Sequence, residues 1–303
     1  MLNALSALVP IVIALALGWL LGRALPSRWL AAVPTALTLC IWALLFAVGW
    51  TCADTLAKPG MAGRVLVVGL TFAFCATLGA WLLIWACLGR RHAAPRAERN
   101  GTASAWGSLR AAFATLAWVA VGAAAARYMG PAFAHYLPLP NIAQLIDLLV
   151  FLVGMELAKR PLSTLRMGRA QLTLPLLALA GSYIGGLAAA ALTSTTWKTA
   201  LALSSGFGWM SLSSGMISAA LGSDYGAVAM VTDLFRELIA IVLLFVAGAT
   251  LPMACIGATG ATAMDATLPI VRQTCPPDTL RYALASGFVL SMLAPLLISV
   301  FLA

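Results

Sequence analysis

The sequence predicts an all-α fold, a polytopic bundle of transmembrane helices with about ten membrane segments. Of its 303 residues, 62% are hydrophobic and only 9% are charged, whereas roughly a quarter of the residues in an average soluble domain are charged. Apolar stretches of about 18 to 22 residues recur along the chain, and each can cross a hydrocarbon core about 30 Å thick as a helix. Too few charges remain to cover a water-facing surface, which excludes a soluble enzyme.

Charged residues, Pro and Gly divide the chain into about ten apolar segments, whose ends are set to within about 2 to 4 residues. The first five are 5–22, 30–50, 65–88, 109–127 and 142–157, and the other five are 172–192, 199–221, 228–248, 251–271 and 280–302. Two of them, in the C-terminal third, are interrupted by Gly, Ser or Pro and are expected to be discontinuous helices. For 251–271 we expect a broken helix that still crosses the membrane.

The net charge of +9 comes from 18 Lys and Arg residues against nine Asp and Glu residues. Most of the cations lie in short loops, where positive residues mark the cytoplasmic side, so the charge predicts orientation and not nucleic-acid binding. With the N-terminus outside, the loop cations left outside are Lys58, Arg64, Arg127 and Lys198. Both termini are therefore expected in the periplasm. If 251–271 did not cross, Arg272 and Arg281 would also lie outside, which favours a crossing helix.

One internal similarity links the second and fifth segments. Residues 44–49 (LLFAVG) resemble residues 149–154 (LVFLVG), at an offset of 105 residues. Because the offset spans three segments, the two copies would face opposite sides of the membrane, as inverted-topology repeats do. Chance similarity between two apolar helices is the alternative.

Ionisable side chains inside apolar segments are the most informative feature, because each costs about 2.5 to 3.5 kcal/mol near the bilayer centre and needs a partner or a role. The acidic residues in or at the edge of these segments are Asp54, Asp147, Glu156, Asp224, Asp233, Glu237 and Asp265. The plainly intramembrane cation is Arg236. Asp54 follows the second segment, where it is either a functional carboxylate or a solvated boundary residue.

Asp233, Arg236 and Glu237 lie at helical spacings of three and four, which place Asp233 on one face with both others. An internal ion pair is one interpretation. The other is that Arg236 or its partners contact a substrate, or that one carboxylate exchanges a proton, since two acids face one base.

Asp265 lies in the interrupted segment 251–271, among Gly257, Gly260 and Pro269. A broken helix is tolerated in a membrane only where its backbone is buried or lines a cavity. A carboxylate beside unwound backbone suits a cation, because half-helix ends supply complementary partial charges. A plain role in the helix turn is the alternative.

Residues 204–215 interrupt the seventh segment with a run rich in Gly and Ser. Small residues also allow close helix packing in membranes, which is the alternative explanation. Two interruptions in the C-terminal third nevertheless predict two broken helices that face each other across one site near the midplane.

No catalytic or metal site is expected in the chain. His92 and His135 lie in loops, and the six cysteines show no C-x-x-C spacing. The H-E-x-x-H helix of zinc proteases and a nucleotide-binding loop are also missing from the sequence. We therefore expect no enzyme and no cofactor, and a channel remains an alternative to a carrier.

At these interrupted and charged stretches the sequence resembles the bacterial lysine exporter family of the LysO type. The stretches that carry the resemblance are 205–213 (SGFGWMSLS), 233–241 (DLFRELIAI) and 260–269 (GATAMDATLP). Their order and spacing agree with the family, and the weaker similarity extends over essentially the whole chain. Two departures are Thr232, where Asn is expected, and Met210, where an aromatic residue is expected. Neither removes an ionisable group.

The resemblance implies an inner-membrane secondary transporter that exports L-lysine and close analogues, with the proton gradient as energy source. From the apolar segments and the polar run at 90–100 (RRHAAPRAERN) we expect one transporter domain over 1–303, with a helical group at 1–89, a cytoplasmic linker at 90–108 and the remaining helices at 109–303. Lysine needs carboxylates for its amines, and Arg236 or freed backbone amides for its carboxylate. Burial favours the protonated form of an acid, which would allow exchange for a proton.

The residues expected to form the substrate or ion site are Asp54, Gly206, Gly208, Trp209, Ser211, Ser213, Asp233, Arg236, Glu237, Thr262, Asp265 and Thr267. The expected partners are L-lysine or an analogue and the lipid bilayer, with no nucleic acid, and a homodimer is one assembly that the sequence allows. The alternative functions are a cation-selective channel and a transporter of another small amino acid or organic ion.

Overall fold

A computed structural model describes residues 2–26, 31–56, 60–89, 117–128, 142–158 and 169–303. The regular structure within these ranges is helical, with no strand, which confirms the predicted all-α class. Four helical stretches in them are long and apolar enough to cross a membrane by themselves, namely Val33–Thr51, Met61–Leu88, Leu172–Thr193 and Pro277–Leu302. The predicted linker at 90–108 lies outside the described residues.

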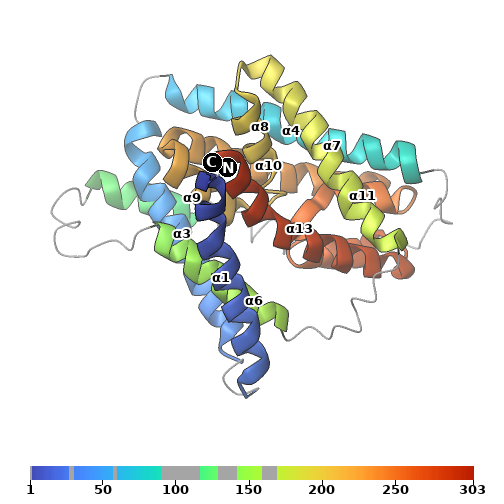
Figure 1. Ribbon diagram of the computed structural model, residues 1–303. Coiled ribbons are helices and arrows are strands. Elements are labelled where there is room, and N and C mark those ends of the chain that lie inside the picture. Colours follow the sequence, from blue (N-terminus) through green and yellow to red (C-terminus); the bar gives the residue numbers. More distant parts are fainter. Residues whose placement is uncertain (1, 27–30, 57–59, 90–116, 129–141, 159–168) are drawn as a thin grey trace.

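The helices follow the predicted apolar segments closely (Figure 1). In chain order they are α1 (Leu2–Ala24), α3 (Val33–Leu56), α4 (Met61–Leu88), a helix over 117–128, α6 (Ile142–Ala158), α7 (Arg169–Thr193), α8 (Trp197–Ser204), α9 (Met210–Leu221), α10 (Ser223–Ala247), α11 (Pro252–Thr259), the 3-10 helix η2 (Gly260–Met264), α12 (Leu268–Thr274), the 3-10 turn η3 (Pro277–Thr279) and α13 (Leu280–Leu302).

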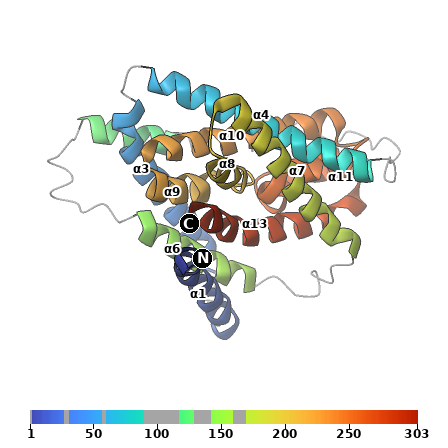
Figure 2. The ribbon, with the colours of Figure 1, turned by 45° about the horizontal axis from the view of Figure 1, so that its top comes forward.

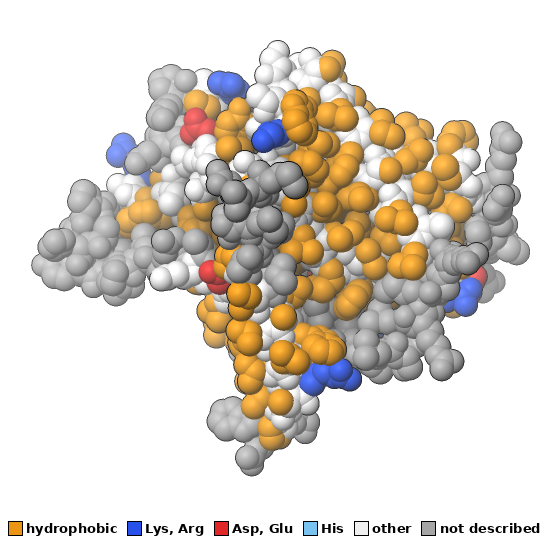
Figure 3. All heavy atoms as spheres, viewed as in Figure 1, with side chains coloured by type: hydrophobic (Ala, Val, Ile, Leu, Met, Phe, Trp, Pro, Cys, Tyr) orange, Lys and Arg blue, Asp and Glu red, His pale blue; other side chains and the backbone are white. Residues whose placement is uncertain are grey.

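Side chains on the outer faces of these helices are apolar, as lipid contact requires. Leu176, Ile184 and Leu192 on α7 are 57%, 59% and 73% exposed. Figure 3 shows hydrophobic side chains over most of the described part of one face, with few charged groups. In a soluble protein such a surface would drive association, so the long apolar helices and this surface together indicate a multi-pass membrane protein.

Helices α1 and α6 pack closely through small residues. A Cβ built on Gly18 would collide with the backbone of Phe151, and one on Gly154 would lie 2.5 Å from the carbonyl oxygen of Leu15. Small residues let helix backbones approach one another where lipid removes the hydrophobic drive for association. The two glycines therefore fix the crossing of α1 and α6.

Helix α3 crosses the helix over 117–128 in the same way. A Cβ on Gly49 would collide with the backbone of Val119, and one on Gly122 would collide with that of Phe46. The four helices α1, α3, 117–128 and α6 are called the outer bundle below. Helix α3 also packs on α6, and this contact joins the pair α1 and α6 to the pair α3 and 117–128.

Helices α4, α7 and α10 form the centre of the remaining structure, called the core below together with 197–221, 252–274 and α13. Gly79 on α4 faces Gly181 on α7, and Gly69 on α4 faces Val231 on α10. The start of α1 and the end of α13 lie side by side in both Figure 1 and Figure 2, and α1 packs on α13. Both termini therefore lie at one side of the molecule.

Residues 197–221 form a helical hairpin, called the first hairpin. Helix α8 runs back along α7, with the hydroxyls of Ser205 and Tyr183 3.0 Å apart. Helix α9 then runs antiparallel to α10, where Ser218 packs on Gly226. Thr193–Thr195, just before the hairpin, and Asp224–Tyr225, just after it, line one cleft of about 120 Å³. The chain thus enters and leaves this hairpin at the same end of the core.

Residues 252–274 form a second hairpin, which enters from the opposite end. Helix α11 runs back along α10, and the Cys255 thiol donates to the Leu243 carbonyl oxygen at 3.3 Å. Helix α12 then returns to the end of the core where α10 ends. Thr274, the last residue of α12, lies beside Gly248, which follows α10, because a Cβ on Gly248 would lie 3.0 Å from the Thr274 hydroxyl oxygen.

The breaks in both segments lie where the Gly, Ser and Pro clusters predicted them, but neither segment continues in its original direction. At 251–271, where a broken helix that continues through the bundle was expected, the chain forms a returning hairpin instead, and 199–221 does the same. The physical reason lies at the breaks, where Gly208 and Gly260 have φ angles of +87° and +66° that turn the chain back.

Candidate substrate site

The tips of the two hairpins, residues 205–209 of the first and 260–267 of the second, meet beside the middle of α10. The backbone N–H of Ala261, in the second tip, donates to the carbonyl oxygen of Phe207, in the first tip, at 2.9 Å. Gly208 also packs closely against Thr262: a Cβ built on Gly208 would lie 3.3 Å from the Thr262 methyl carbon. One backbone hydrogen bond and close packing thus join two unwound segments that enter from opposite ends.

Asp233 holds the first tip in place. Its carboxylate is fully buried and accepts a hydrogen bond from the Gly208 backbone N–H at 2.8 Å and another from the Ser213 hydroxyl. A Cβ on Gly206 would collide with the same carboxylate. A buried acid needs such donors, and Asp233 therefore positions the tip.

Arg236, one turn further along α10, ties the same hairpin to α7. Its guanidinium is fully buried, donates to the Ser182 hydroxyl at 2.6 Å and to the Ser204 carbonyl oxygen at 3.3 Å. It also lies over the Phe207 ring, 5.4 Å from the centroid. Within the described part of the chain, its hydrogen bonds go to α7 and the first hairpin, and not to Asp233.

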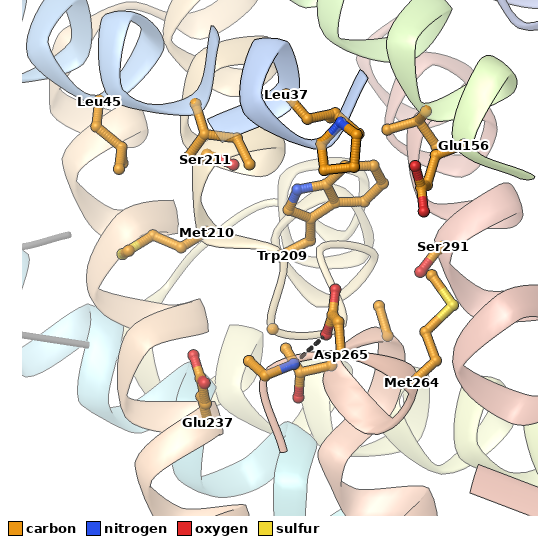
Figure 4. A pocket seen from close by; sticks show the side chains of 17 residues that line it. Leu37, Leu45, Glu156, Trp209, Met210, Ser211, Glu237, Met264, Asp265 and Ser291 are labelled. Atoms are coloured by element: carbon orange, nitrogen blue, oxygen red, sulfur yellow. Dashed lines mark hydrogen bonds between the residues drawn. The ribbon is translucent and has the colours of Figure 1, made fainter. Parts of the chain in front are cut away.

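A cavity of about 420 Å³ lies against the two tips (Figure 4), within the usual range of about 300 to 1,000 Å³ for small-molecule sites. Its walls come from α3 and α6 of the outer bundle and from both hairpins, α10 and α13 of the core. The lining residues are Pro34, Leu37, Ile41, Leu45, Val153, Glu156, Gly208, Trp209, Met210, Ser211, Glu237, Ala261, Thr262, Met264, Asp265, Ala266 and Ser291.

Three carboxylates point into this cavity from three elements. Glu156 comes from α6, Glu237 from α10, and Asp265 from the second tip. Asp265 is exposed to the cavity and accepts a hydrogen bond from the Ala266 backbone N–H at 2.6 Å. Three acidic side chains in a mostly apolar described lining make the cavity suited to a cation.

Six of the predicted site residues line the cavity, and the others lie around it. Those in the lining are Gly208, Trp209, Ser211, Glu237, Thr262 and Asp265. Gly206 lies in the first tip against the Asp233 carboxylate, and Ser213, Asp233 and Arg236 lie behind this tip. The Thr267 hydroxyl donates to the Thr262 carbonyl oxygen at 3.0 Å within the second tip. Asp54 lies in the last turn of α3, and its side chain is outside the described part of the structure.

Glu156 belongs to the cavity lining but was not among the predicted site residues. The sequence did mark it as an acid near the end of an apolar segment, as it marked Asp147. Such acids are also typical of solvated segment ends, and the spacing on α6 alone does not indicate which of the two faces the hairpin tips.

Comparison with known proteins gives matches to exporters. Residues 116–302 match the model of the family described as Lysine exporter LysO. The chain is 38% identical over 156 residues to the Lysine exporter LysO of Escherichia coli (strain K12), which covers 51% of this chain and 52% of that protein. It is 34% identical over 170 residues to a putative lysine exporter of Haemophilus influenzae, covering 55% and 87% of the two chains. The match thus spans about half the length of the Escherichia coli relative. No solved structure matches the chain.

Proposed function

Because the chain belongs to the lysine exporter LysO family, we propose that it is a secondary transporter that exports L-lysine and close cationic analogues across the bacterial inner membrane. The family consists of exporters, which is what the sequence predicted in place of an enzyme. The observation that supports the substrate class is the cavity at the hairpin tips, with its three carboxylates and no described basic side chain in the lining.

Lysine carries two ammonium groups and one carboxylate, and the cavity offers partners for both kinds of group. Glu237 and Asp265 supply carboxylates for an ammonium. Helix α9 begins in the lining at Met210 and Ser211, and the first amides of a helix lack intrahelical partners and attract anions. The substrate carboxylate would bind there, because the Gly208 amide already donates to Asp233.

For the membrane topology we propose eight crossings and two re-entrant hairpins, which together make the ten predicted membrane segments. When both 199–221 and 251–271 turn back, Arg272 and Arg281 stay on the side of the other basic loops. The charge argument against a re-entrant 251–271 therefore disappears. With this topology both termini lie in the periplasm and the linker at 90–108 in the cytoplasm.

The packing of the outer bundle supports the inverted repeat. Gly49 and Gly154 occupy the same place in the two sequence copies. Each lies where its own helix crosses a helix of the other copy. Their partner helices carry Gly18 and Gly122, at nearly the same offset. The copies α1–α3–α4 and 117–128–α6–α7 each contain three crossings, and an odd number inverts the second copy.

Lysine efflux would be coupled to proton entry through the cavity carboxylates. A carboxylate that releases the substrate ammonium in a mostly apolar cavity favours protonation. Exchange of one cation for one proton then leaves the charge of the cavity unchanged. A cation-selective channel, the alternative, needs no such exchange.

Proteoliposomes loaded with labelled lysine test the proposal. With the external solution more acidic than the lumen, we expect saturable lysine efflux that collapses when a protonophore removes the gradient. Asp265→Asn should lower the rate about tenfold or more, the cost of a lost charge-assisted hydrogen bond. Asp278→Asn, in the exposed turn η3, should leave it unchanged. Unsaturable flux without dependence on the gradient would favour the channel, and the absence of lysine flux would refute lysine as the substrate.

A further inference from the structure

Glu156 differs from the other two cavity acids in the part of the molecule that carries it. Glu237 and Asp265 belong to the core, whereas Glu156 belongs to α6 of the outer bundle. The other outer-bundle residues in the described lining are apolar, namely Pro34, Leu37, Ile41, Leu45 and Val153. Glu156 is thus the one charged group that the outer bundle contributes to the described lining.

The packing of α6 fixes which way Glu156 faces. Gly154 lies against α1, and Val153 and Glu156, one turn apart, face the cavity. The other acid of this helix, Asp147, is exposed and absent from the lining. Nine residues separate it from Glu156, about half a turn beyond a whole number of turns. Two acids on one helix therefore have opposite surroundings.

The three acids are spread across the cavity with apolar surface between them. In Figure 4, Glu237 and Met210 lie on one side of the cavity, Glu156 lies on the other, and Asp265 lies between them. Trp209 and Leu37 contribute apolar lining to the same cavity. A substrate with an ammonium group at each end and an aliphatic stem between them matches this order of charged, apolar and charged surface.

We propose that Glu156 binds the side-chain ammonium of the substrate and selects it against amino acids with neutral side chains. This inference rests on the proposed function. The amino-acid end of the substrate then lies at the start of α9, near Glu237, and the stem passes Trp209. The bound substrate connects the outer bundle to the core, because its two ends bind to different parts of the molecule.

Competition between lysine and norleucine separates this role from a merely structural one, since norleucine shares the amino-acid end but lacks the side-chain ammonium. In proteoliposomes, Glu156→Gln should raise the KM for lysine about tenfold or more, as the loss of one charge-assisted hydrogen bond predicts. The inhibition constant of norleucine should stay within about twofold, a difference of less than 0.5 kcal/mol. Glu156→Asp should recover part of the lysine affinity because it restores the charge.

The matched control is Asp147→Asn, the other acid of α6, which should leave both constants unchanged. An unchanged ratio of the two constants in Glu156→Gln, with lysine still transported, would refute the role of Glu156 and leave the proposed function intact. If the unmodified protein does not transport lysine, the proposed function fails, and the role of Glu156 fails with it. Equal loss of lysine and norleucine binding in both Glu156 variants would indicate a structural role and would also refute the inference.

Discussion

Both hairpin tips turn the chain back, but the acids beside them lie in different surroundings. At the first tip, Asp233 is fully buried behind the turn and accepts hydrogen bonds from Gly208 and Ser213. At the second tip, Asp265 is part of the turn itself and is exposed to the cavity. The second tip is held instead by its own threonines, Thr262 and Thr267.

This difference separates an acid that shapes the site from an acid that can bind a cation. Both acids are close to the meeting point of the hairpins, so closeness to the site does not distinguish them. What distinguishes them is the exposure of the carboxylate, since Asp233 is fully buried and Asp265 is exposed. Changes behind the first tip should therefore affect stability most, and changes at Asp265 should affect transport.

Asp233→Ala should give the largest loss of stability. It leaves the Gly208 amide and the Ser213 hydroxyl without their acceptor and the buried Arg236 charge without a nearby acid. Removing one partner from buried charged groups costs about 3 to 5 kcal/mol. The measurement is the midpoint of thermal unfolding in detergent, followed by size-exclusion chromatography, with Asp278→Ala as control. A midpoint no lower than that of the control would contradict the structural role of Asp233.

Gly206→Ala should have an intermediate effect, because the added Cβ would collide with the Asp233 carboxylate. Forcing an extra methyl group into a packed site costs about 1 to 3 kcal/mol. Gly63→Ala is a matched control, since a Cβ at Gly63 meets no atom within 4 Å among the described residues. The same unfolding assay should separate the two variants, and equal midpoints would show that the first tip tolerates displacement.

Thr267→Val should give the smallest effect of the three. It removes the hydroxyl that donates to the Thr262 carbonyl oxygen at 3.0 Å, and a neutral hydrogen bond contributes about 0.5 to 1.5 kcal/mol. Thr71→Val is the control, because the Thr71 hydroxyl donates to a carbonyl oxygen of its own exposed helix turn. A destabilisation as large as that of Asp233→Ala would show that the second tip is as tightly held as the first.

Much of the helical fold could be predicted from the sequence, because hydropathy and breaking residues act locally. The ends of α4 and α13 and the positions of both breaks agree with the apolar runs and the Gly-rich clusters. The direction of the chain after each break could not be predicted, since a crossing helix and a returning hairpin have the same composition. The charge argument does not distinguish the two arrangements, because two segments that both return would leave Arg272 and Arg281 on the same side as two segments that both cross.

The candidate site was predictable only in part. Motifs around Trp209, Glu237 and Asp265 drew attention to residues that do line the cavity. Spacing on α10 suggested that Asp233 and Arg236 pair, but the hydrogen-bond partners of Asp233 lie 20 and 25 residues away along the chain. Such partners depend on tertiary packing, which helical periodicity does not describe.

The most direct test of the cation site at the hairpin tips is the binding of lysine to the purified protein by isothermal titration calorimetry. We predict saturable binding to the unmodified chain, at least about tenfold weaker binding to Asp265→Asn, and unchanged binding to Asp278→Asn. The thermal unfolding midpoint of Asp265→Asn should equal that of the unmodified protein, because Asp265 is exposed. Equal lysine affinity of Asp265→Asn and the unmodified protein would contradict the account.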